Sequence, residues 1–324
     1  MAEKDKKTSM GQKLLKSNSA TLILILLVVI IVFSCLNKNY FSAQNATNIF
    51  YSATTVGLLA IGETFLMIGG HIDLSCSALA AMSGVIVALL IQNNLPWGIA
   101  LIIVLLIGVV VGLLNSALAN IWHIQPFIAT LAVASICEGA GYIISNGRPI
   151  PITNRSFINL GTYKFFGWIP VPVILMVIAF LAFGFVLKRT TFGRRIYIIG
   201  GNAEAAHLAG IDPKKISTIL YIISSALGAF AGGVLAARMH TGAPTAASGA
   251  DFDAITAVVL GGIAFTGGKG TMGGCFIGLM IIQCFNTGLS VVGVSSFWQS
   301  VAKGILLIFA LVLDDFRMRS ASGK

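Results

Sequence analysis

Long apolar segments follow one another along almost the whole chain, and they restrict its fold more than any other feature. A helix that crosses the hydrocarbon core of a bilayer needs roughly 17–25 mainly apolar residues. Segments of this kind lie at residues 20–36, 50–69, 74–92, 97–121, 126–145, 169–187, 216–237, 254–265, 272–292 and 297–313. Hydrophobic residues make up 56% of the chain and charged residues only 10%. The sequence therefore predicts an all-α polytopic membrane protein with about ten transmembrane helices.

The segment 254–265 is too short to cross a bilayer alone, so the residues before it must also enter the membrane if it is to span. This segment overlaps the second of two glycine-interrupted stretches, 69–77 and 249–262. The two stretches show a faint likeness to each other. Such stretches in corresponding halves are pointers to a transport pathway. We therefore expect an inverted five-plus-five repeat, with Asp73, Ser75, Asp251 and Asp253 as polar pathway residues.

Lysines and arginines indicate which helix ends face the cytoplasm, because cytoplasmic loops are enriched in both. With the N-terminus inside, most of the 21 basic residues fall on the cytoplasmic side. We expect cytoplasmic tails at 1–19 and 314–324, a transmembrane domain at 20–313 and a cytoplasmic loop at 188–215. The net charge of +10 then lies beside anionic lipid headgroups, which argues against nucleic acid as a partner.

No group of residues suited to catalysis or metal binding stands out in the sequence. The five cysteines and four histidines are scattered, so we expect no metal site. The stretch GKGTMG at 268–273 matches GxGxxG, but no strand precedes it and no acid follows until Asp314. We interpret it as a tight turn. The chain is thus expected not to be an enzyme, and any ATP coupling must come from another subunit.

Three ionisable residues, Glu63, Glu138 and Lys303, lie inside predicted helices, where a charge is costly. In one interpretation they are functional, with Glu63 on the pathway, or with Glu63 or Glu138 carrying protons in a secondary transporter. In the other, one of the two glutamates forms a buried structural pair with Lys303. Both interpretations stay open from the sequence.

The insert TTFGRRIYIIGGNAEAAHLAGIDPKK, at 190–215, is charged and carries helix-capping residues. Asn202 is a good N-cap, Glu204 suits the positive end of a helix dipole, and Gly210 permits a left-handed stop. These residues predict a short helix at 203–209 with small side chains, among them Ala205 and Ala206. We expect an exposed docking helix for a partner; the alternative is a helix that lies on the headgroups.

Five ordered blocks of the sequence resemble the permease subunits of bacterial ribose- and xylose-type ABC importers. They are GGHIDLSCSALAAMSG (69–84), QPFIATLA (125–132), TTFGRRIYIIGGNAEAAHLAGI (190–211), SGADFDAITAVVLGGIAFTGGKGTMGG (248–274) and NTGLSVVGVSSFWQSVAKGILLIFALVLD (286–314). The family usually has Gly-Gly-Ile-Asp where His71 interrupts this chain.

The resemblance implies a bacterial inner-membrane permease for a simple sugar such as ribose. It also implies a second permease copy, expected to form a homodimer, and a cytoplasmic ABC ATPase pair that binds ATP and Mg. A periplasmic or lipid-anchored sugar-binding protein completes the assembly, and this chain itself needs no cofactor. Residues 190–211 match the family's coupling region. The residues expected to act there are Arg194, Asn202, Glu204, Ala205, Ala206 and Gly210.

The longest outer segment, 145–168, is the expected docking site for the binding protein. Arg148, Arg155 and Lys164 lie in it, although basic residues are otherwise scarce on that side. The alternative is that these side chains only reach to outer headgroups.

Competing function classes are a proton-coupled secondary sugar transporter, a passive channel and a membrane-embedded enzyme. The sequence does not distinguish ribose from xylose, galactose, another simple sugar or a sugar-like signal molecule.

Overall fold

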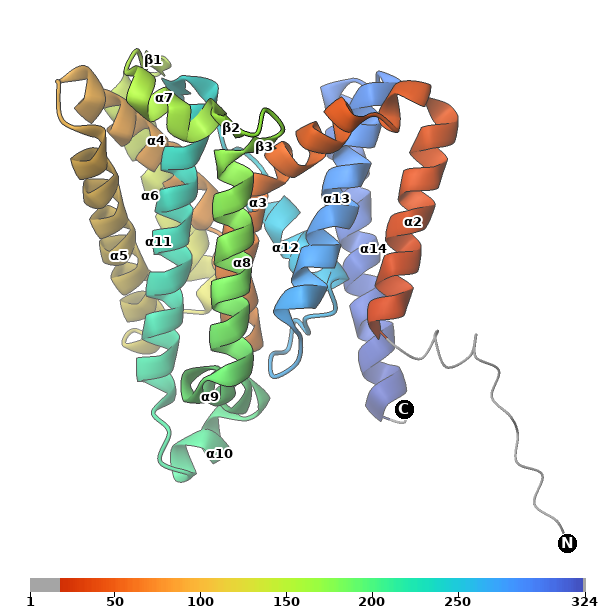
Figure 1. Cartoon of the computed structure of the whole chain (residues 1–324). Helices are drawn as coiled ribbons and strands as arrows, with labels where there is room; N and C mark the ends of the chain where they lie inside the picture. The colour runs from red at the N-terminus through yellow and green to blue at the C-terminus, as the bar shows by residue number, and fades with distance from the viewer. Residues whose placement is uncertain (1–17, 323–324) are drawn as a thin grey trace, which may run out of the picture.

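The computed structural model describes residues 18–322. Most of them lie in helices, and the long helices run between two opposite ends of the molecule (Figure 1). The helices are α2 (Asn18–Leu36), the short 3-10 helix η1 (Lys38–Tyr40), α3 (Ala43–Ile68), α4 (Cys76–Gln92), α5 (Trp97–Asn120), α6 (Pro126–Ser145), α7 (Arg155–Thr162), α8 (Val171–Arg189), α9 (Thr191–Gly201), α10 (Ala203–Leu208), α11 (Pro213–Met239), α12 (Ala250–Leu260), α13 (Met272–Val292) and α14 (Ser296–Ser322). Four two-residue strands complete the fold: β1 (Ile150–Pro151), β2 (Lys164–Phe165), β3 (Ile169–Pro170) and β4 (Thr241–Gly242).

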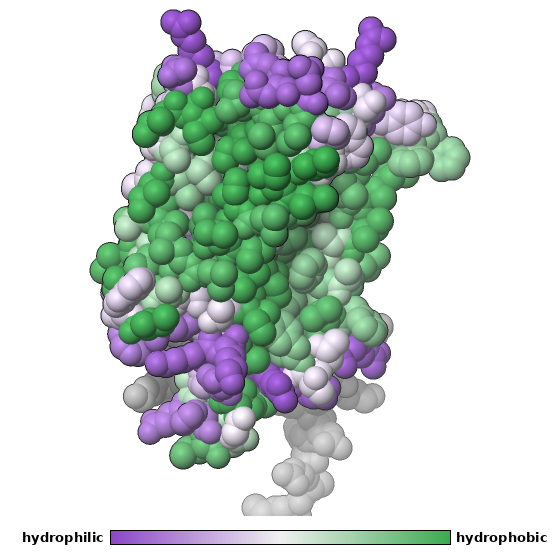
Figure 2. Space-filling view, turned by 90° about the vertical axis from the view of Figure 1, so that its left-hand side faces the viewer, coloured by the Kyte–Doolittle hydropathy of each residue, from purple (hydrophilic) through white to green (hydrophobic). Residues whose placement is uncertain are grey.

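Six of the described helices are long and apolar enough to cross a membrane, namely α3, α5, α6, α8, α11 and α13. Shorter apolar stretches form α2, α4 and most of α14. Figure 2 shows the resulting surface, with a broad apolar band between two polar ends. Leu106 and Leu181 are about two-thirds exposed within this band, which is the surface that lipid covers. The predicted all-α polytopic membrane protein is thus confirmed.

Each predicted segment corresponds to one helix, but the limits of three helices differ clearly. Helix α3 begins at Ala43 instead of residue 50. The helix expected at 254–265 is α12, which begins at Ala250 after left-handed Gly249. It ends at Leu260, and the capping residue Gly261 packs so closely on the backbone of Gly274 that a side chain would not fit. The last helix continues to Ser322, through most of the expected tail at 314–324. Residues 1–17 of the expected N-terminal tail and residues 323–324 lie outside the described residues.

The core of the bundle is built on α3 and α11, the two most buried long helices. They cross where Gly62 lies against the backbone and hydroxyl of Ser224. Helix α5 packs on α11 in the same way, because Gly108 and Gly112 lie against the α11 backbone. The small residues spaced four apart therefore allow close helix contact. In both halves a long buried helix is followed by a non-helical connection and a shorter helix: α3 by α4, and α11 by α12.

The two ends of the bundle carry different elements (Figure 1). At one end lies α7 with its neighbouring strands; β1 pairs antiparallel with β4, and β2 pairs antiparallel with β3. At the other end α9 and α10 project beyond the long helices. We call these the α7 end and the α10 end.

Candidate functional site

Helix α10 is held at both of its ends by the residues that the sequence singled out. The Ala205 backbone N–H donates to Asn202 Oδ1 at 2.9 Å, and Gly210 has a positive φ of 78°. Asp212 then caps α11 by accepting from the backbone N–H groups of Lys214 and Lys215. The hydrogen bond from the Lys215 backbone, aided by the charge of its side chain, holds the pKa of the Asp212 carboxyl below its usual value. The predicted short helix is confirmed, ending one residue earlier at Leu208.

The exposed face of α10 differs from the expected one at a single position. Glu204 and Ala205 are exposed, whereas Ala206 is completely buried and belongs to the main hydrophobic core. The expectation that Ala206 lies on a docking face is therefore wrong. Leu208, which the sequence analysis did not single out, is 84% exposed at the end of α10. An exposed leucine next to small side chains suits a contact with another protein.

Helix α9, which the sequence analysis did not predict, carries exposed Arg194 and joins the α10 region to the bundle. Thr190 caps it by accepting from the Gly193 N–H at 3.1 Å, a signal that could have been found in the sequence. Gly200, near its end, lies directly on the carbonyl of Ile68 and on the backbone of Gly268.

The connection between α12 and α13 is joined to the same place. The Gly268 N–H donates to the Ile68 carbonyl at 2.8 Å, and the Tyr197 hydroxyl donates to the Gly270 carbonyl at 2.8 Å. Both Gly268 and Gly270 have positive φ, whereas Met272 and Gly273 of the stretch GKGTMG already belong to α13. The stretch therefore forms the end of the non-helical connection and the start of α13. One junction thus brings α9, the end of α3 and the α12–α13 connection together.

The connection between α3 and α4 carries Asp73 and Ser75, which form a buried polar cluster. Asp73 accepts from the Ser75 N–H at 2.8 Å and from its hydroxyl at 2.5 Å, while Asn115 donates to Ser75 Oγ at 2.8 Å. Ser224 of α11 donates to the second oxygen of Asp73 at 3.4 Å. These groups fix the connection against α5 and α11. Neither Asp73 nor Ser75 is exposed to solvent in this conformation, so their predicted pathway role stays a prediction.

Glu63 lies in the middle of the core, close to this cluster. Cys76 Sγ lies 3.9 Å from one of its carboxyl oxygens, and the other oxygen has no hydrogen-bond partner among the described residues. Among the described residues no basic side chain forms an ion pair with Glu63. Lys303 Nζ instead lies 2.8 Å from Asp253 Oδ2. The interpretation in which Glu63 or Glu138 forms a buried structural pair with Lys303 is therefore wrong. Asp253 also accepts from Asn286 at 3.2 Å, and Asp251 is nearly buried beside it in the first turn of α12.

Glu138, unlike the buried Glu63, lies on the surface of the bundle. It is exposed on α6, and its helical neighbours Leu131, Ser135 and Tyr142 on the same side of the helix are exposed as well. A carboxylate facing lipid from inside a span costs several kcal/mol, roughly 2.5–3.5 on insertion scales for comparable charges. The face of α6 that carries Glu138 therefore suits contact with protein or water better than contact with lipid.

A pocket of about 270 Å³ opens beside the α3–α4 connection, and the sequence analysis did not predict it. Its polar side chains are His71 and Gln125, and Phe127 and Phe265 lie with them in its wall. Such a mixture of hydrogen-bonding groups and apolar rings is typical of small-molecule sites, and it matches a sugar, which has hydroxyls and apolar C–H faces. His71 lies 3.4 Å from the Tyr221 hydroxyl. The signal was present in the sequence, because His71 is the residue that departs from the resembled motif.

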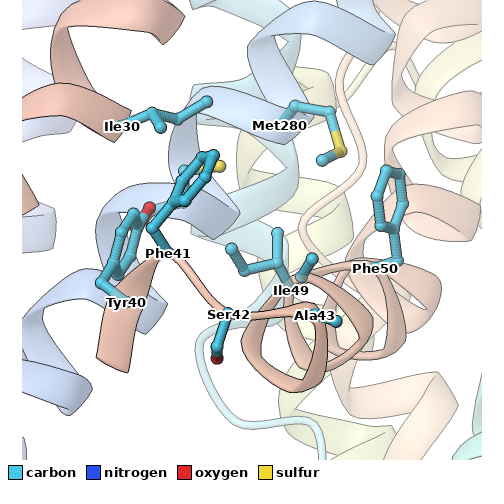
Figure 3. Close-up of a pocket in the computed structure, with 10 residues that line it drawn as sticks. Ile30, Tyr40, Phe41, Ser42, Ala43, Ile49, Phe50 and Met280 are labelled. Carbon is cyan, nitrogen blue, oxygen red and sulfur yellow. The ribbon is translucent and has the colours of Figure 1, made fainter. Parts of the chain in front are cut away.

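A second pocket, of about 410 Å³, lies towards the α7 end between α2, η1, α3 and α13 (Figure 3). Its wall is apolar, with Ile30, Ile49 and Met280 among its residues. The hydroxyls of Tyr40 and Ser42 already donate to backbone carbonyls of Cys284 and Asn39. This pocket therefore offers little to a sugar.

The segment 145–168 is firmly held at the α7 end. Phe157 is completely buried beneath α7, and Gly161 packs on the backbone of Ala237. The Tyr51 hydroxyl donates to the Gly161 carbonyl, and the Arg238 guanidinium lies 4.1 Å above the Tyr51 ring. Arg148, Arg155 and Lys164 are exposed on this rigid support, as a docking surface requires.

Comparison with known proteins gives a consistent result over most of the chain. Residues 45–311 match the family described as branched-chain amino acid transport system / permease component. The ribose import permease protein RbsC of Bacillus subtilis is 40% identical over 91% of this chain and 92% of its own. The L-arabinose ABC transporter permease protein AraH of Azospirillum brasilense is 32% identical, over 93% of this chain and 88% of its own. The D-allose transport system permease protein AlsC of Escherichia coli is 35% identical, over 90% and 89%.

No solved structure gives a significant match. The family match nevertheless covers well over half of the chain, and each of these relatives is aligned over nearly its whole length. The structure described above has six helices long and apolar enough to cross a membrane among its described residues, which suits a membrane permease. The chain therefore belongs to the family of branched-chain amino acid transport system permease components, and it is a multi-pass protein of the bacterial inner membrane.

Proposed function

We propose that this chain is the translocation subunit of an ATP-driven importer for a simple sugar. The observation that carries the proposal is the junction of Gly200, Gly268 and Ile68, which joins the projecting α9–α10 unit to both halves of the bundle. A partner that pushes α10 thereby moves the end of α3 and the α12–α13 connection together. That is the mechanical requirement of a membrane subunit driven by a separate ATPase, which would itself bind ATP and Mg.

The α10 end is assigned to the cytoplasm and the α7 end to the periplasm. Seven basic residues lie at the α10 end: Lys188, Arg189, Arg194, Arg195, Lys214, Lys215 and Lys269. Cytoplasmic loops carry such an excess. Exposed Arg148, Arg155 and Lys164 then face the periplasm, where a sugar-binding protein would dock.

The substrate class follows from the relatives and from the His71 pocket. The relatives are named for ribose, L-arabinose and D-allose, which are all simple sugars. His71 and Gln125 can hydrogen-bond hydroxyls, and no carboxylate is in the wall to demand a charged ligand. The pocket lies where the α3–α4 connection leaves α3, next to the Gly200 junction. Release of the sugar to the cytoplasm would be controlled at this place. Ribose is the first sugar to test.

A second copy of this chain completes the pathway. The exposed face of α6 that carries Glu138 is the surface best suited to it, because a water-lined boundary between two copies spares this carboxylate from lipid. ATP binding would switch the pair between inward- and outward-facing arrangements by moving α10. The permease itself needs only weak, reversible contacts with the sugar.

The proposal is tested by uptake of radiolabelled ribose into vesicles that hold the permease, its cognate ATPase and its binding protein. Uptake should require all three proteins and ATP, and it should continue when a protonophore removes the proton gradient. Xylose, L-arabinose and D-allose serve as competitors that define the sugar class. Uptake without the ATPase, or collapse with the protonophore at constant ATP, would instead favour a secondary transporter that uses Glu63 or Glu138.

A further inference from the structure

A groove lies between α8 and α13 and reaches α9 near the α10 end. Its volume is about 890 Å³. The wall within the membrane band is apolar and comes from Phe180, Leu181 and Phe185 of α8 and from Met272 and Phe276 of α13. Phe180 and Phe276 meet edge to face, with ring centroids 5.2 Å apart. The groove therefore offers an apolar wall between two helices that are long and apolar enough to cross a membrane.

The end of this groove is strongly basic. Lys188 and Arg189, in the last turn of α8, and Arg194, in α9, all line it and are all exposed. The ion pairs found among the described residues join Lys215 to Asp212 and Lys303 to Asp253, so none of these three cations has an acidic partner there. The Tyr197 side chain and Thr271 add polar groups to the same end.

We propose that this groove is a binding site for one anionic phospholipid. The acyl chains lie between α8 and α13, and the phosphate lies among Lys188, Arg189 and Arg194. Basic pockets between transmembrane helices bind acidic headgroups in this manner. The assignment to the cytoplasmic leaflet rests on the proposed function, whereas the site itself does not.

An acidic surface of the ATPase is the other occupant that three cations could attract. The lipid is favoured because the cations do not stand alone: they close one end of an apolar groove at membrane depth, which a water-soluble partner would leave empty. The lipid also has a consequence for coupling. Arg194 and Tyr197 belong to α9, so one bound molecule contacts α8, α9 and α13 at once and braces the support of α10.

The first experiment measures lipid binding by native mass spectrometry of the purified permease alone. Phosphatidylglycerol should remain bound at detergent concentrations that remove phosphatidylcholine. Lys188→Gln with Arg189→Gln should weaken phosphatidylglycerol binding roughly tenfold or more. The matched control is Lys214→Gln with Lys215→Gln, which removes the same charge from the same end outside the groove and should leave binding unchanged.

A second pair of variants tests the apolar part of the site. Gly273 lines the groove, and no other heavy atom is within 4 Å of the place where its Cβ would be. Gly273→Phe should therefore fold normally and reduce the retention of both lipids by occupying the groove. Gly98 is the matched control, because it is also the second residue of its helix and equally open, but far from the groove.

Equal retention of the two phospholipids would overturn the proposal. So would lipid retention that is unchanged both in the Lys188→Gln, Arg189→Gln double variant and in Gly273→Phe. So would a basic-pair variant that loses the ATPase on co-purification while its lipid binding stays normal, because the cations would then serve the protein partner. Binding is measured without transport, so a failure of the sugar-import proposal leaves this result intact, and the reverse also holds.

Discussion

At the scale of single residues, the structure separates polar groups that hold the bundle together from those that line an opening. Asp73 accepts hydrogen bonds from Ser75 and Ser224 in a completely buried place, whereas His71, two residues earlier, lines a pocket. Asp73→Ala should lower the thermal stability of the purified permease, because each buried donor left unpaired costs about 1–3 kcal/mol. His71→Ala should reduce sugar uptake with a much smaller change in melting temperature.

Thermal unfolding and vesicle uptake, measured on the same preparations, check this contrast. Ser300→Ala is a control, because Ser300 is an exposed residue of α14 whose hydroxyl donates to the Ser296 carbonyl of the same helix. An Asp73→Ala protein that is stable but fails to transport would support the predicted role of Asp73 in the transport pathway.

A second prediction at this scale concerns two alanines of α10, Ala205 and Ala206. Ala205→Asp places a carboxylate on the exposed face and should weaken ATPase co-purification while the melting temperature stays near that of the parent. Ala206→Asp buries the carboxylate in the core, at a cost of more than about 2 kcal/mol, and should destabilise the permease itself. Normal association and normal transport with Ala205→Asp would show that this face is no docking surface.

Local chemistry explains which residue-level predictions succeeded. The caps at Asn202 and Gly210 depend on neighbours within three residues, so the sequence contains all the information. The partner of Lys303 is 50 positions away, and only the fold brings Asp253 to it. The burial of Ala206 likewise depends on what packs against α10.

At the scale of elements, hydropathy found the ten apolar helices but not their limits. Helix α9 escaped prediction because TFGRRIYIIGG mixes charged, apolar and glycine residues without a long apolar run. Helix α12 was placed too late, because its first turn contains Asp251 and Asp253. Burial against α13 and α14 stabilises that turn, and one sequence taken segment by segment does not reveal such packing.

The α7 end gives a prediction about the binding protein. Arg148→Glu with Arg155→Glu should weaken stimulation of ATPase activity by the sugar-loaded binding protein, most strongly at low salt, because exposed charges mainly speed association. Basal ATPase activity should stay near normal, since Phe157 and Gly161 hold the segment from below.

Lys38→Glu is the control for this experiment, because Lys38 is an exposed lysine of η1 at the same end. Stimulation that is unchanged across a salt series in the double variant would move the docking site to residues 240–253.

At the scale of the whole molecule, a single copy leaves Glu138 on its outer surface, and a second copy would resolve that cost. In a two-fold assembly the same face of α6 meets itself, so Ser135→Cys or Leu131→Cys should cross-link to the identical residue of the partner in native membranes.

The test uses a short thiol-reactive cross-linker in a Cys35→Ser background, because Cys35 is the one exposed cysteine among the described residues. A product near twice the 34.0 kDa mass of one chain should appear on gels. Leu106→Cys, 60% exposed on α5, provides the control and should stay monomeric. Cross-linking through Leu106 but not through Ser135 or Leu131 would place the second copy on α5, and Glu138 would then need another explanation.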